Sequence, residues 1–293
     1  AAVRQGLDRR WVLRSGYAFA LLAGVAATYS VLTGRYGETY YTVGSNLTQE
    51  YQAPHALVTM LVLGAPFVVH ALLSSRGAVR WVHSLVLAGL AALAVLSMVR
   101  SGILAMGVLL FAVALHVAGR GSTRQRISVA VGGSSVLLVW LWLQDLAIAR
   151  LGALLPSSTS GAAIGSGRSV FWLALIREVT ASPASVAVGM GGGADRAIIT
   201  AATGMRIGAH SDPLELLAVG GLVLLATYGW FLYAPFKRAV SLARYEHAGD
   251  ARDVGVVFVA AAAGFLVLAT TNGAMGYQGS VAFGLLGGLA LGL

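Results

Sequence analysis

The sequence contains no cysteine and few charged residues, and these two absences exclude several classes of protein. Without cysteine the chain can form neither a disulfide nor a thiolate metal site. Charged residues make up 11% of its 293 residues, whereas a soluble domain carries about 25%. Hydrophobic residues make up 57%, and the mean hydropathy is +0.79. These values exclude an ordinary soluble domain and predict a polytopic membrane protein.

The few charges are strongly biased toward arginine. The formal net charge is +9, and because Lys237 is the only lysine, 19 of the 20 basic residues are arginine. No basic run alternates with aromatic residues on a soluble domain, as a nucleic-acid-binding surface requires. We therefore expect membrane lipids as partners and no nucleic acid. The chain begins with Ala1 and shows no signal-peptide pattern, so we expect further helices upstream.

Apolar runs separated by polar connections predict an all-α bundle of about eight membrane helices. Most runs approach the roughly 18 residues that are needed to cross a bilayer core. We treat residues 1–293 as a single membrane domain. The predicted spans are 15–33, 56–73, 81–98, 102–118, 127–143, 213–235, 254–270 and 280–293.

Positive charge alternates between the connections and predicts their sides. Basic residues gather before the first helix and in the second, fourth and sixth connections, which the positive-inside rule places in the cytoplasm. Arg100, the segments 34–54 and 272–279, and the long segment 144–212 then share the outer face. We expect 144–212 to be an external catalytic loop.

The long loop contains a predicted amphipathic helix at 166–182. Phe171, Trp172, Leu175 and Val179 recur at helical spacing and would bury one face against the membrane helices or the membrane interface. The glycines before Arg168 leave backbone N–H groups free at the start of this helix, and such groups favour anions.

Two arginines are candidate ligands for an anionic headgroup. Arg100 lies in a tight connection between two predicted helices, and Arg168 opens the amphipathic helix. The guanidinium fork suits a phosphate or pyrophosphate better than the point charge of lysine does. The alternatives are a snorkelling interface residue for Arg100 and a solvated loop charge for Arg168. A cation at a helix N-terminus opposes the helix dipole, which favours the functional interpretation of Arg168.

His210 is the candidate general base. Its unperturbed pKa lies near 6.5, so it can accept a proton at neutral pH. Asp212 and Glu215 follow within about a turn and would orient the imidazole. The alternative is that His210 caps or packs at the start of a helix.

Other polar residues of the loop carry weaker signals. Arg206 is a candidate secondary contact to a phosphate or sugar. The glycine-rich stretch 189–196 lacks the Lys-Ser/Thr and the strand–turn–helix context of a nucleotide site. We interpret it as a linker, or as a loop whose backbone approaches a ligand or the membrane. Asp195, Asp212 and Glu215 lack a metal-ligand spacing, so we expect neither a metal nor a cofactor.

Three short elements occur in a fixed order along the chain. Residues 97–102 read Ser-Met-Val-Arg-Ser-Gly; 167–172 read Gly-Arg-Ser-Val-Phe-Trp, followed by Pro183 and Gly-Met-Gly at 189–191; 210–217 read His-Ser-Asp-Pro-Leu-Glu-Leu-Leu, followed by two glycines. In these elements the chain resembles the O-antigen ligase and O-antigen polymerase family of bacterial envelope glycosyltransferases. Two departures are Val219, where the family often has an acidic residue, and the helix count, which is usually higher in the family.

The resemblance implies a location and a chemistry. The protein would lie in the bacterial cytoplasmic membrane and transfer a glycan from a polyprenyl-pyrophosphate donor to a glycan or glycolipid acceptor on the outer face. Arg100 and Arg168 would engage the pyrophosphate, and His210 would activate the acceptor hydroxyl. Ligases and polymerases of cell-surface polysaccharide share this pattern.

Two other classes of function remain open. A transporter or flippase of lipid-linked sugars would carry charges inside its membrane helices and paired halves, and this sequence shows few such charges and no repeat. A non-catalytic envelope scaffold would not need the outer arginines and histidine.

Overall fold

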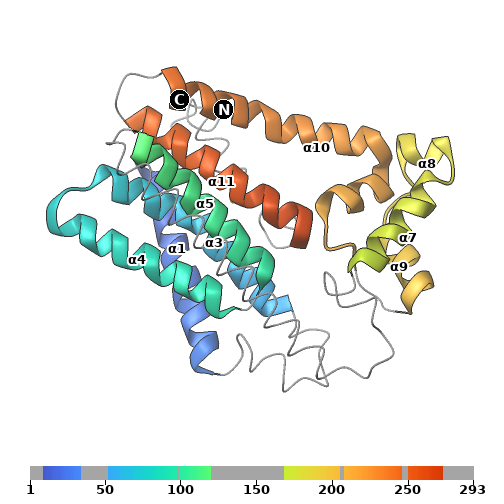
Figure 1. The fold of residues 1–293 in the computed structure, drawn as a ribbon, viewed down its shortest axis with the longest axis horizontal. Helices are drawn as coiled ribbons and strands as arrows, with labels where there is room; N and C mark the ends of the chain where they lie inside the picture. Colours follow the sequence, from blue (N-terminus) through green and yellow to red (C-terminus); the bar gives the residue numbers. More distant parts are fainter. Residues whose placement is uncertain are drawn as a thin grey trace. The chain divides into compact units, whose positions relative to one another are not determined.

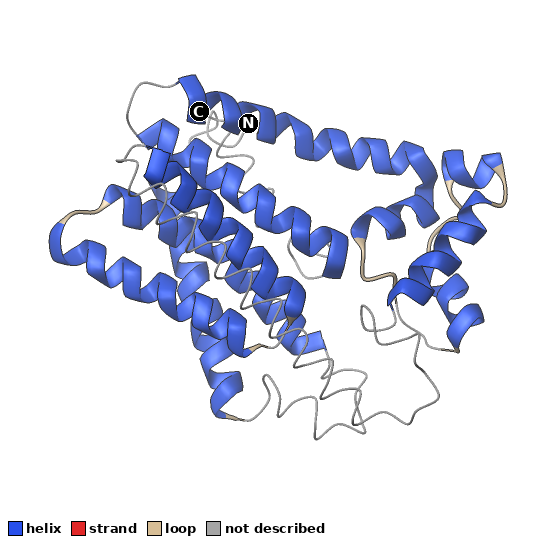
Figure 2. Cartoon of the chain, in the orientation of Figure 1, coloured by secondary structure: helices blue, strands red, loops and turns tan. Residues whose placement is uncertain are grey.

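A computed structural model describes residues 9–33, 52–97, 99–119, 168–204, 208–245 and 250–272. These residues are almost entirely α-helical, and no strand occurs among them, which confirms the all-α prediction (Figures 1 and 2). The helices are α1 (Arg9–Leu32), α3 (Gln52–Ser74), α4 (Gly77–Leu96), α5 (Arg100–Gly119), α7 (Arg168–Thr180), α8 (Pro183–Val188), α9 (Ala194–Thr203), α10 (Asp212–Tyr245) and α11 (Asp250–Asn272).

Five of these helices, namely α1, α3, α4, α10 and α11, are long and apolar enough to cross a membrane, as expected for a multi-pass membrane protein. Together with α5 they correspond to six of the eight predicted spans. The other two, 127–143 and 280–293, lie outside the described residues. By their contacts the described helices belong to two units. The first holds α1, α3, α4, α5, α10 from Ala234 and α11 as far as Leu268. The second holds α7, α8, α9, α10 as far as Tyr233 and the end of α11.

In the first unit the helices pack through small residues. Helix α3 is largely buried, whereas α1 and α4 expose most of their apolar side chains. A Cβ atom on Gly64 of α3 would lie 2.8 Å from the Cα atom of Ala20 in α1, and one on Gly264 of α11 would lie 3.1 Å from the carbonyl oxygen of Ala105 in α5. Such close approach of backbones is typical of helices in a bilayer, where van der Waals packing drives association.

The connection between α4 and α5 is as tight as the sequence predicts. The Ser97 hydroxyl donates to the carbonyl oxygen of Ala94 at 2.6 Å and accepts from the backbone N–H of Val99 at 3.1 Å. This buried side chain therefore satisfies backbone groups that the end of a helix leaves unpaired. Arg100 is the first residue of α5, so it begins the second helix of the pair.

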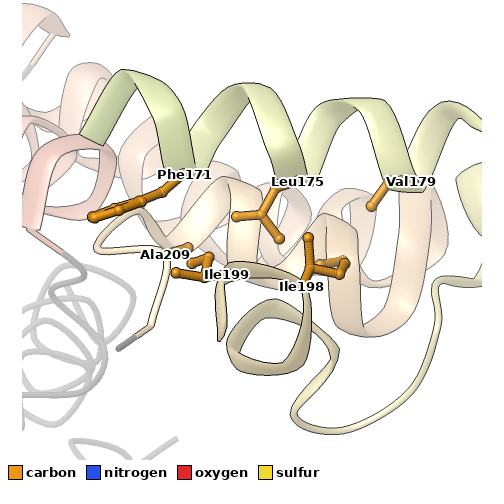
Figure 3. Close-up of a cluster of buried hydrophobic side chains, with 7 residues drawn as sticks. Phe171, Leu175, Val179, Ile198, Ile199 and Ala209 are labelled. Atoms are coloured by element: carbon orange, nitrogen blue, oxygen red, sulfur yellow. The ribbon is translucent and has the colours of Figure 1, made fainter. Parts of the chain in front are cut away.

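The second unit has a small hydrophobic core of its own. The predicted amphipathic helix is present as α7, and Phe171, Leu175 and Val179 are 5%, 1% and 1% exposed. Trp172 is half-buried against the same cluster. The buried face packs on Ile198 and Ile199 of α9 and on the residues around the start of α10 (Figure 3). The prediction of a buried face is confirmed, and its partners are α9 of the loop and the start of α10, which is one of the apolar helices long enough to cross a membrane.

Helix α10 is interrupted at Gly221. The φ and ψ angles of this residue are 63° and −159°, a conformation that is essentially confined to glycine. The carboxylate of Asp212 lies near enough to the hydroxyl of Tyr228 for the two groups to interact. In an unbroken helix, residues at these positions would lie about 24 Å apart along the axis. The chain therefore turns sharply at Gly221, as the ribbon shows (Figure 1).

The glycine-rich stretch closes this turn. The backbone N–H groups of Met190 and Gly191 donate to the carbonyl oxygens of Ala218 and Val219 at 2.8 and 3.0 Å. These are carbonyls that the end of the first part of α10 would otherwise leave unpaired. The sequence predicts that this stretch is a linker or a loop whose backbone approaches a ligand or the membrane. In the structure its backbone instead approaches the backbone of α10.

No side chain fits between the two segments. A Cβ atom on Gly189 would lie 2.5 Å from the carbonyl oxygen of Val219, and one on Gly221 would lie 2.5 Å from that of Ala187. Gly189 also has a positive φ, 73°. Both positions therefore require glycine for two independent reasons, the backbone conformation and the available space. We call this backbone contact the glycine contact.

We expect Gly189→Ala and Gly221→Ala each to lower the free energy of unfolding by at least about 2 kcal/mol. A side chain at such backbone angles costs about 1–3 kcal/mol, and the clash with a carbonyl adds to it. The measurement is the unfolding midpoint of the purified chain in detergent.

Gly192→Ala is the matched control, because Gly192 lies in the same turn, has no positive φ, and has nothing within 4 Å of an added Cβ atom. Equal stability of Gly189→Ala and Gly192→Ala would contradict the glycine contact.

Candidate active site

The segment that leads into α10 carries the predicted base and is held by α7. The indole Nε1–H of Trp172 donates to the carbonyl oxygen of Ala209 at 2.9 Å. Ala209 is fully buried and Ser211 is 4% exposed. His210, between them, is half-buried. A flexible loop would not bury its backbone in this way, so this segment is an ordered part of the second unit.

His210 has an unusual backbone conformation. Its φ is 51°, and it is the one non-glycine residue in the described part of the chain with a positive φ. Side chains other than glycine, asparagine and aspartate pay about 1–2 kcal/mol in this left-handed region. Strained residues of this kind cluster at active sites and ligand-binding sites. The strain therefore favours a functional role for His210 over a simple cap, because a cap does not need it.

The start of α10 explains the acidic residues after the histidine. The backbone N–H of Glu215 donates to the carbonyl oxygen of Ser211 at 2.9 Å, so the helix begins directly after His210. Asp212 and Glu215 lie in the first turn, where carboxylates interact favourably with the helix dipole. Asp212 is 3% exposed and faces Tyr228. The predicted role of Asp212 in orienting His210 stays a prediction.

Helix α9 brings a further carboxylate to this segment. Asp195 is 3% exposed, and an ideal Cβ on Gly208 would lie 3.4 Å from its Oδ2 atom. The charges of Asp195 and Arg196 also act on Glu215, with opposite signs. Asp195 therefore lies between the turn after α9 and the start of α10. Its position within the glycine-rich stretch gave no sign of this burial.

Arg168 belongs to the same unit as His210. It is the first residue of α7, as predicted, and no acidic residue in the first turn compensates the positive end of the helix dipole. Arg168 precedes Trp172 by one turn, about 6 Å along the helix axis. Because Trp172 contacts Ala209, the beginning of α7 lies near the His210 segment.

The structure does not place the other two predicted ligands, Arg100 and Arg206, beside His210. Arg100 belongs to the first unit, so its convergence with Arg168 and His210 stays a prediction. Arg206 lies outside the described residues. Among the residues that the structure describes, no group of three or more His, Cys, Asp or Glu side chains is arranged to hold a metal ion.

Two site contacts were not predicted from the sequence. The hydrogen bond from Trp172 to Ala209 joins residues 37 positions apart, and the contact between Asp212 and Tyr228 depends on the break at Gly221.

Comparison with protein-family models, curated proteins and solved structures finds no match for this chain.

The strain at His210 predicts an unusual order of stability. We expect His210→Gly to be more stable than His210→Ala by about 1 kcal/mol, because glycine adopts a positive φ at little cost. The measurement is denaturant or thermal unfolding of both variants in the same detergent.

His83 provides the control, because it lies inside α4. There alanine is expected to be the more stable substitution by about 1 kcal/mol, since glycine weakens a helix interior. If alanine were also the better substitution at 210, the left-handed conformation of His210 would be wrong.

Proposed function

We propose that the protein is a membrane glycosyltransferase that moves a glycan from a polyprenyl-pyrophosphate donor to an acceptor sugar hydroxyl. The observation that carries the proposal is the position of His210. His210 is a half-buried residue with a strained backbone, and its segment is held near the start of a helix that begins with Arg168. The three sequence elements that resemble the O-antigen ligase and polymerase family add independent support.

In the proposed reaction His210 is the general base. The acceptor O–H gives its proton to the imidazole, and the acceptor oxygen forms a bond to the anomeric carbon. The bond from that carbon to the pyrophosphate oxygen breaks, and the pyrophosphate leaves with the bonding electrons. A positioned base contributes about 10²- to 10⁴-fold to such a rate.

Arg168 and Arg100 stabilise the charge that develops on the leaving group. A guanidinium forms two parallel hydrogen bonds with a phosphate, and the interaction strengthens as negative charge accumulates there. The N–H groups of the first turn of α7, which have no partner within the helix, add donors of the same kind. The pyrophosphate linkage supplies the free energy of transfer, so the proposal needs no nucleotide.

The proposed location is the outer face of the bacterial cytoplasmic membrane. Two arguments support this location. The basic connections are expected on the cytoplasmic side, and the O-antigen ligase and polymerase family, which this chain resembles, uses acceptors on the outer face. The alternatives are a transporter or flippase of lipid-linked sugars and a non-catalytic scaffold. Transfer of a lipid-linked glycan to an acceptor by the purified protein distinguishes a glycosyltransferase from both.

Substitutions at the site test the assigned roles. We expect His210→Ala to lower the transfer rate by about 10²- to 10⁴-fold with nearly unchanged donor binding. Arg168→Lys keeps the charge but loses a charge-assisted hydrogen bond, and we expect a loss of about 10- to 100-fold. Asp212→Asn should be milder. The measurements are glycan transfer and direct binding of a polyprenyl pyrophosphate.

Arg177→Lys is the matched control for Arg168→Lys, because Arg177 is an exposed residue in the last turn of the same helix. If His210→Ala transferred glycan at the wild-type rate, His210 would not be the general base. Loss of pyrophosphate binding in that variant, with normal transfer at saturation, would make His210 a donor ligand.

The absence of cysteine permits a direct test of sidedness. Arg177→Cys on α7 and Arg76→Cys between α3 and α4 both place a thiol at an exposed position. We expect a membrane-impermeant maleimide to label the first in intact spheroplasts and the second only after permeabilisation. The reverse pattern would place the proposed site in the cytoplasm.

A further inference from the structure

We propose that Trp172 is a positioning residue that fixes the orientation of His210 through the carbonyl group of Ala209. The inference rests on the proposed function, because it concerns the residue assigned there as the base. It adds a residue to which the sequence gave only a packing role.

The argument begins with the peptide group between Ala209 and His210. Its carbonyl oxygen accepts the 2.9 Å hydrogen bond from the Trp172 indole, and its nitrogen is that of His210. A peptide group is planar, so holding the oxygen also holds the N–H and the direction of the N–Cα bond. The rotation about that bond is the φ angle of His210, which takes the unusual value of 51°.

The peptide on the other side of His210 leads into an equally restrained residue. Ser211 is buried, and its carbonyl oxygen accepts from the backbone N–H of Glu215 at 2.9 Å. The start of α10 therefore holds the chain after the histidine, and Trp172 holds it before the histidine. With both ends restrained, relaxation to a negative φ would require one of these contacts to break.

Trp172 is suited to this role by its own surroundings. Its ring packs against the hydrophobic core of the second unit, one residue after the buried Phe171. The indole carries a single donor and no acceptor, so its hydrogen bond has one direction. Because Trp172 and Arg168 share α7, the same rigid helix sets the positions of the base and of the proposed donor ligand.

The experiment compares Trp172→Phe, which keeps an aromatic ring but has no N–H, with the wild-type chain. We expect kcat for glycan transfer to fall by about 10²-fold, the effect of misplacing a reacting group by about 1 Å. The KM for the lipid-linked donor should stay within about twofold of the wild-type value, since Arg168 is unchanged. Trp230→Phe is the control, because Trp230 is 72% exposed on α10, and it should keep wild-type kinetics.

A double variant separates positioning from general structure. If Trp172 acts through His210, then Trp172→Phe with His210→Ala should transfer no more slowly than His210→Ala alone. Losses that multiply, or a KM that rises together with the fall in kcat, would make Trp172 a structural residue and overturn the proposal.

A second readout does not depend on transfer. Carbethoxylation of each histidine by diethyl pyrocarbonate is followed in the full chain by peptide mass spectrometry. We expect Trp172→Phe to change the rate at His210 several-fold and to leave that at His83 unchanged. An unchanged rate at His210 would overturn the inference. A changed rate in a chain that transfers no glycan would support the positioning of His210 and reject the proposed function.

Discussion

The glycine contact between Gly189 and Gly221 is the constraint on which the second unit depends. Both residues have positive φ angles, and the space between their segments is too small for a side chain. The turn at Gly221 brings the two parts of α10 together, so that Asp212 lies near Tyr228. It also leaves the carbonyls of Ala218 and Val219 free to accept from the turn after α8. One backbone contact therefore places both the start of α10 and the end of α8.

The strain at His210 is sustained by the packing around it. A left-handed non-glycine residue is unfavourable by about 1–2 kcal/mol, which is small beside the burial of several apolar side chains at about 1.5–3 kcal/mol each. Phe171, Leu175 and Val179 contribute such burial from one face of α7. The core of the second unit thus holds an unfavourable conformation at the segment where the chemistry is proposed to occur.

The sequence predicts the parts of this fold that depend on local pattern. Six of the eight spans predicted from apolar runs correspond to described helices, because length and hydropathy decide membrane insertion. Helical spacing from Phe171 predicts α7. Helix α8, with six residues, is too short to show a period. The break in α10 was missed because 213–235 reads as one apolar run, and the clash that demands glycine at 221 comes from Ala187, far away in the chain.

The candidate site also contains residues that the sequence predicts and residues that only the structure reveals. Residue chemistry and order along the chain are enough to select Arg168 and His210, because those properties are local. The donor that holds Ala209, the burial of Asp195 and the partner of Asp212 depend on tertiary contacts between separate helices. A single sequence does not encode such contacts in its spacing, so these residues appear only once the helices are packed.

The interruption at Gly221 also limits the length of the continuous helix in α10. Helix α10 contains 34 residues, which at 1.5 Å per residue would extend about 51 Å, well beyond the roughly 30 Å hydrocarbon core of a bilayer. The part after Gly221 extends about 36 Å, and its last turns carry Lys237, Arg238 and Arg244, whose long side chains can reach the membrane surface. The interruption thus shortens the continuous helix, and the nine residues before it, which begin with the buried Asp212, follow a separate direction from the part that ends in the basic residues.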